Sequence, residues 1–171
     1  MEKTEIKAQI IEKAQEAANE IPLFQVVDAA HIAGREHLLS SFWHAFRHFK
    51  AGRTISSNFS LEVLLYAAGV RQIHQAISLL GIQDSTQAIG LIAGSPNLVK
   101  LQKNISSFIN SIGAKRDDTV LEINPSKMKY LAKVLGTPNI PVDQATILRR
   151  VAETALLTTE KSNGFGMYHY S

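Results

Sequence analysis

Apolar residues recur along most of the chain at the three- and four-residue intervals of an α-helix. The segments with this spacing are predicted to be helices, and they span residues 4–20, 35–50, 61–68, 71–80, 95–113, 124–136 and 143–161. Most of them have one apolar and one polar face, as expected of helices that pack on a core. The 61–68 segment is apolar on all sides, so it is predicted to be buried all round.

Three shorter segments have the composition of β-strands, at residues 23–27, 86–93 and 119–123. Together with the helices they predict a mixed α+β (α/β) fold, in which a small sheet of three or four strands packs with about six or seven helices. We expect a single domain over residues 1–161 and a flexible C-terminal tail over residues 162–171.

The predicted helix ends carry the residues that helix ends require. Two helices are predicted to begin at a capping residue followed by proline, at Ser95 and at Asn124. The capping side chain accepts a free backbone N–H, and a proline in the first turn loses no hydrogen bond. Gly52, Gly69 and Gly81 lie just past predicted helix ends, where glycine is common.

The composition is that of an ordinary globular domain, with 171 residues of which 45% are hydrophobic and 19% charged. The absence of cysteine excludes disulfides, thiol catalysis and cysteine-based metal sites. The first residues lack the basic and apolar regions of a signal peptide, and no apolar stretch approaches the roughly 18 residues of a membrane span. We therefore expect a cytoplasmic protein.

Basic residues are concentrated in one stretch of the chain, although the net charge is only +3. Between His31 and His74 the chain holds five of its six histidines and only two acidic residues, Glu36 and Glu62. The other basic residues of this stretch are Arg35, Arg47, Lys50, Arg53 and Arg71. Such clustering is typical of a surface that binds a polyanion, and the alternative is a solvated helix face.

The common catalytic motifs are missing: the chain has no phosphate-binding glycine loop, no G-x-S-x-G nucleophile elbow and no H-E-x-x-H zinc helix. The segment 164–166 (GFG) has too few glycines for a dinucleotide site. Asp117 and Asp118 could serve acid–base chemistry, but they precede a predicted strand, where aspartate commonly forms turns. The sequence therefore predicts a protein that binds partners and not an enzyme.

A stripe of histidines raises the question of a metal site. His37, Ser41, His44 and His48 fall on one side of the predicted helix 35–50. Two histidines four residues apart can share a metal, but a stable zinc site takes three or four protein ligands. We therefore expect a wet basic face here and no metal.

Several motifs resemble those of one protein family. The longest spans residues 52–73, GRTISSNFSLEVLLYAAGVRQI, and is similar to the central motif of the TPRKB-like kinase-binding subunits of the KEOPS complex. The histidine-rich helix from residue 31 and the segments 71–81 and 117–124 are similar to archaeal members. The resemblance covers residues 23–161. The N-terminal helix from Thr4 departs from it, because archaeal members often begin with a short glycine-containing strand.

The resemblance implies a role without chemistry of its own. In the KEOPS complex, which installs threonylcarbamoyl on an adenosine of tRNA, this subunit binds and stimulates the small atypical kinase. It also helps to hold the tRNA by its CCA end. No cofactor, membrane or small-molecule substrate is implied.

Residues for both partners can be named on this basis. The last helix is expected to supply much of the kinase contact, through Leu148, Val151, Ala152, Ala155, Leu156 and Leu157. The residues expected to converge on the RNA are Arg53, Asn58, Ser60, Tyr66, Arg71 and Gln72. For Arg71 the alternative is a salt bridge with Glu62. An alternative for the whole chain is a small nucleotide-binding protein or hydrolase whose site does not show as a motif.

Overall fold

The computed structural model describes residues 3–134 and 143–163, with residues 156–163 as helical backbone only. The helices are α1 (Lys3–Glu20), α2 (Arg35–Lys50), α3 (Phe59–Ala68), α4 (Ile73–Leu80), α5 (Leu98–Ser111), α6 (Pro125–Val134) and α7 (Gln144–Asn163). Two strands, β1 (Leu23–Asp28) and β2 (Ile89–Gly94), and two 3-10 helices, η1 (Ala29–His31) and η2 (Asp118–Leu121), are also present. The seven predicted helices and the mixed α+β class are thus confirmed. Residues 164–171 of the predicted tail lie outside the described residues.

The sheet is smaller than predicted. Strands β1 and β2 pair antiparallel, from Leu23 opposite Gly94 to Asp28 opposite Ile89, and no further strand occurs in the described part of the chain. The third predicted strand, 119–123, is wrong because local hydrogen bonds hold the segment as η2. The Asp117 carboxylate accepts the Thr119 N–H at 3.0 Å. An aspartate that bonds to the backbone two residues on favours a turn over a strand.

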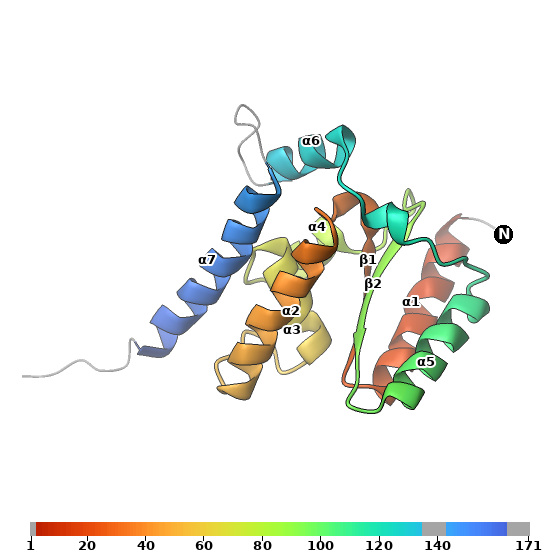
Figure 1. The fold of residues 1–171 in the computed structure, drawn as a ribbon, viewed down its shortest axis with the longest axis horizontal. Helices are drawn as coiled ribbons and strands as arrows, with labels where there is room; N and C mark the ends of the chain where they lie inside the picture. The colour runs from red at the N-terminus through yellow and green to blue at the C-terminus, as the bar shows by residue number, and fades with distance from the viewer. Residues whose placement is uncertain (1–2, 135–142, 164–171) are drawn as a thin grey trace, which may run out of the picture.

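The two strands form a ribbon between two groups of helices (Figure 1). Phe24 and Val26 pack with residues of α1 and α5 on one side of the ribbon. Leu23 and Val27 point the other way, toward α2 and α3. Successive strand residues face opposite sides, so β1 joins both halves of the core. None of the described helices has the length and hydropathy needed to cross a membrane.

Helix α3 is the most buried element, as predicted. Ser60 and all residues from Glu62 to Ala68 are buried. The helix ends at Gly69, which adopts a left-handed conformation with φ +65°. A side chain there would be strained, and its Cβ would lie 2.8 Å from Cγ of Arg150. Gly69 therefore lets the chain leave α3 while α7 packs closely against it.

Two of the predicted helix starts can be compared with the structure. At α6 the Asn124 side chain accepts the Lys127 N–H at 3.0 Å, so the predicted cap is confirmed. At α5 the prediction is wrong, because the cap is Asn97 and not Ser95. The Asn97 side chain accepts the Lys100 N–H at 2.9 Å, while Ser95 Oγ accepts the Asn97 N–H. Asparagine caps as well as serine does, so the helix starts later.

The histidine stripe of α2 faces the protein and not the solvent. His37 and Ser41 are 1% and 0% exposed, and His44 and His48 are half-buried. His37 Nδ1 accepts the Ala33 N–H at 3.1 Å, so Nε2 carries the proton and donates it to the Ala67 carbonyl at 2.8 Å. The predicted wet basic face is therefore wrong, because this side of α2 covers α3. The described residues contain no cluster of three or more metal-ligating side chains.

His37 should make the fold sensitive to acid. Burial lowers the pKa of His37 below its ordinary value of 6.5, although the hydrogen bond to Ala67 opposes this. Because the unfolded chain then binds the proton more readily, the free energy of unfolding should fall as pH drops below about 6.5. The slope contributed by one such proton is up to about 1.4 kcal/mol per pH unit.

The measurement is urea unfolding at pH 7.5, 6.5 and 5.5. The control is His37→Gln, which has no ionisable ring, so it should be less stable at pH 7.5 and lose less stability on acidification. Parallel pH profiles for the two proteins would contradict the prediction.

Candidate partner-binding surfaces

The outer side of α2 is an exposed face of large apolar side chains. We define the aromatic face as Leu39, Trp43, Phe46 and Phe49, which are 39%, 58%, 37% and 40% exposed. Two half-buried rings, Phe42 and Phe59, lie beneath it. The Phe59 ring is 5.1 Å from that of Phe49 and 6.3 Å from that of Phe46, measured between centroids. The face is therefore supported by rings from both α2 and the start of α3.

The exposure of these residues follows from how α2 packs. The positions that face α3 are His37, Leu38, Ser41 and Ala45, all buried. Ser41 and Ala45 are small, so α2 approaches α3 closely and its larger rings remain outside. Helical spacing predicted one wide apolar face, and the structure divides it into an inner and an outer part. An exposed apolar cluster of this kind marks an interaction site.

Helix α7 packs directly on α2 and α3 (Figure 1). Val151 and Ala155 are 1% and 5% exposed, because they pack with Ala45 and Tyr66 in the core. Leu148 and Ala152 are half-buried. The side chains of Leu156 and Leu157 lie outside the described residues. The expectation that Val151 and Ala155 contact the kinase is therefore wrong for the chain as folded here: they attach α7 to the domain.

Three of the residues expected at the RNA have structural roles within the fold. Asn58 is exposed, but its side chain caps α3 by accepting the Leu61 N–H at 3.0 Å. Ser60 is buried, and its hydroxyl accepts the Phe24 N–H at 3.1 Å. Tyr66 is 0% exposed and lies beside His44 and His48, so its ring offers no surface on which a base could stack. The expected RNA contacts of Ser60 and Tyr66 are corrected because both side chains are buried, whereas the contact of the exposed Asn58 stays a prediction.

The other three expected RNA residues lie nearer to solvent. Arg53 is exposed in the loop between α2 and α3, where its backbone N–H donates to the His48 carbonyl at 2.9 Å. Gln72 is exposed at the start of α4, and Arg71 is half-buried beside it. Burial raises the pKa of the Glu62 carboxyl, and the positive charge of Arg71 opposes this rise. Arg53 is thus the basic side chain best placed to meet a partner.

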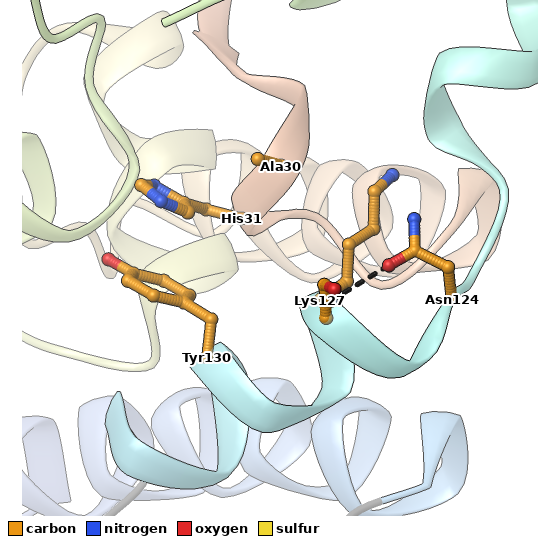
Figure 2. A pocket seen from close by; sticks show the side chains of 6 residues that line it. Ala30, His31, Asn124, Lys127 and Tyr130 are labelled. Carbon is orange, nitrogen blue, oxygen red and sulfur yellow. Dashed lines mark hydrogen bonds between the residues drawn. The ribbon is translucent and has the colours of Figure 1, made fainter. Parts of the chain in front are cut away.

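A pocket of about 200 Å³ opens between η1 and α6 (Figure 2). Its lining residues are Ala30, His31, Asn124, Ser126, Lys127 and Tyr130. The His31 and Tyr130 rings are stacked with centroids 3.7 Å apart. Tyr130 Oη donates to the Leu79 carbonyl at 2.9 Å, and Lys127 Nζ donates to the Val120 carbonyl at 2.5 Å. These contacts hold α6 against η1, η2 and α4, so Tyr130 Oη and Lys127 Nζ are used in packing.

The comparison with known proteins identifies the kind of partner. Residues 2–152 match the family model described as "Kinase binding protein CGI-121". The chain belongs to this family. It is also similar to the Regulatory protein Cgi121 of Methanocaldococcus jannaschii, with 30% identity over 120 residues, 68% of this chain and 74% of the relative. The predicted family is thus confirmed. The protein is a kinase-binding regulatory protein and not an enzyme.

Replacement by glutamate should have different effects in α7 and in the aromatic face, because Val151 is buried and Trp43 is exposed. Val151→Glu should unfold the domain, because it buries an unpaired carboxylate in the core. Trp43→Glu should change the free energy of unfolding by no more than about 0.5 kcal/mol, as is usual for exposed positions. Thermal unfolding followed by circular dichroism measures both. A folded Val151→Glu protein would show that α7 is not packed as described.

Proposed function

We propose that this protein binds and stimulates the small atypical kinase of the KEOPS complex and helps to recruit tRNA through its CCA end. The observation that carries the proposal is the aromatic face of α2, an exposed apolar surface on a member of a kinase-binding family. Stimulation and tRNA recruitment are properties that the family resemblance implies. The aromatic face supports kinase binding, and the exposed Arg53 supports RNA binding.

The aromatic face has the composition of an interface centre. Trp and Phe are enriched where proteins bind one another, and Trp is among the residues whose truncation costs most affinity. Arg47 and Lys50 flank the face on the same helix and are exposed. Helix α7 packs on α2, and the family resemblance assigns kinase contacts to α7. We therefore propose that the kinase docks across the outer sides of α2 and α7.

Recruitment of tRNA requires basic groups that remain free when the kinase is bound. Arg53 lies beyond the C-terminal end of α2 and is exposed. Arg71 and Gln72 stand just before α4, where backbone N–H groups and the helix dipole favour a phosphate. We propose that Arg53 contacts the RNA backbone and that Arg71 and Gln72 make further contacts. The alternative of a small nucleotide-binding protein or hydrolase has no observation of its own in its favour.

Truncation of the aromatic face should weaken kinase binding. Trp43→Ala is expected to cost about 2 kcal/mol or more, which is about 30-fold in Kd, because it removes an exposed indole from the centre of the contact. Isothermal titration calorimetry with the purified kinase subunit measures the change.

The matched control is Val99→Ala. Val99 is 78% exposed on α5, on the other side of the strand ribbon, and should not affect the Kd. If Trp43→Ala binds the kinase as tightly as the wild type, the kinase docks elsewhere. Kinase activity assayed with each variant at saturating concentration tests stimulation separately from binding.

Loss of a phosphate contact has its own signature in the salt dependence of RNA binding. Arg53→Ala should weaken tRNA binding and reduce the slope of log K against log salt by about 0.7, the value for a single-stranded contact. Binding is measured by fluorescence anisotropy between 50 and 300 mM KCl, roughly the range in which such slopes are resolved. Intact tRNA and tRNA lacking CCA are compared.

The matched control is Arg116→Ala, another exposed arginine, which is paired with Asp118 far along the chain. It should leave the salt slope unchanged. Equal affinity for tRNA with and without CCA, or an unchanged slope for Arg53→Ala, would place the RNA on another surface.

A further inference from the structure

A buried carboxylate holds the loop between α2 and α3. Glu62, in the first turn of α3, is 0% exposed. Its two oxygens accept the Ile55 N–H at 3.1 and 3.0 Å, and Oε2 also accepts the Ser56 N–H at 2.7 Å. Backbone donors of the loop are thus satisfied by one side chain from the helix that follows it.

This arrangement needs the charged form of the Glu62 carboxyl, although burial away from water disfavours a charge. Burial raises the pKa of Glu62, and the hydrogen bonds from Ser56 and Ile55 and the charges of His48 and Arg71 oppose the rise. Hydrogen bonds to a charged acceptor are stronger than those to a neutral one. A neutral amide in this place would keep one acceptor oxygen for both N–H groups, lose the negative charge and turn its NH₂ group toward the Ile55 N–H. The acid is therefore suited to hold both N–H groups at once.

Two further hydrogen bonds fix the same loop. Ser56 Oγ accepts the Asn58 N–H at 3.1 Å, and the Arg53 N–H donates to the His48 carbonyl at the end of α2. Arg53 itself is exposed and lies two residues before Ile55. An arginine on a loop that is already ordered loses less conformational entropy on binding than one on a mobile loop.

We propose that Glu62 is a positioning residue that fixes the α2–α3 loop so that Arg53 is presented to the RNA. This inference rests on the proposed RNA contact of Arg53. The buried acid and its two backbone donors then do more than stabilise the fold, because Arg53, the one basic side chain of the loop (residues 51–58), lies between these donors and α2.

The test is a double-mutant cycle on the full chain with Glu62→Gln, Arg53→Ala and the double variant. Glu62→Gln should weaken tRNA binding by roughly tenfold, the scale of a lost charge-assisted hydrogen bond. In the Arg53→Ala background the same change should have no further effect, because the group that Glu62 positions is gone. Hydrogen exchange should show faster exchange of the Ile55 and Ser56 amides in Glu62→Gln.

A general loss of stability must be separated from positioning. Phe108→Leu loosens the remote core between α1 and α5 and serves as a control with a lowered Tm. It should bind tRNA as the wild type does. If Glu62→Gln does not fold, Glu62→Asp replaces it in the double-mutant cycle. Aspartate keeps the negative charge, but its shorter side chain moves the carboxylate away from the loop N–H groups.

The outcomes separate the two proposals. If wild-type protein does not bind tRNA, or Arg53→Ala binds it normally, the RNA proposal fails and the inference with it. If Arg53→Ala weakens binding but folded Glu62→Gln binds normally, or the two losses simply add, only the inference is overturned. A Phe108→Leu protein that loses affinity as Glu62→Gln does would overturn it as well.

Discussion

The structure depends on the burial of most of helix α3, because a helix inside a core must satisfy the polar groups at its own ends. Side chains from its neighbours and from the helix itself do this. Asn58 accepts an N–H at the start, and His37 of α2 donates to the Ala67 carbonyl near the end. Ser60 of α3 accepts an N–H from β1, so the helix is also tied to the sheet. Each bond replaces one that water would otherwise make.

This constraint also decides what remains on the surface. The side of α2 that covers α3 carries His37, Ser41 and Ala45, which are small or hydrogen-bonded to backbone. The large rings of α2 consequently face outward, where they form the aromatic face. The core-facing residues and the aromatic face are therefore two sides of one helix, so the proposed kinase interface needs no separate element.

The loop between α2 and α3 lies where the two proposed surfaces meet. Phe59, just after the loop, supports the aromatic face, while Arg53 within it is the exposed basic group. Glu62 holds the segment between them through backbone bonds that no surface residue could replace. An adaptor that binds a protein and a polyanion benefits from such a rigid junction, because both contacts are then presented in one fixed arrangement.

Periodicity in the sequence determined the seven helices and the burial of α3, since regular spacing identifies which residues share a face. Residue composition indicated the two strands that form, and also a third that does not. The family motifs in the sequence identified the kinase as partner. Only the tertiary structure decided which faces are covered. The histidine stripe was predicted to be a wet face, but His37 and Ser41 are buried and His44 and His48 half-buried; Tyr66 was predicted to be available but is enclosed, because α2 and α7 pack on α3. The segment 119–123 has the composition of a strand. It forms a turn instead, because the Asp117 carboxylate accepts a hydrogen bond from the Thr119 N–H.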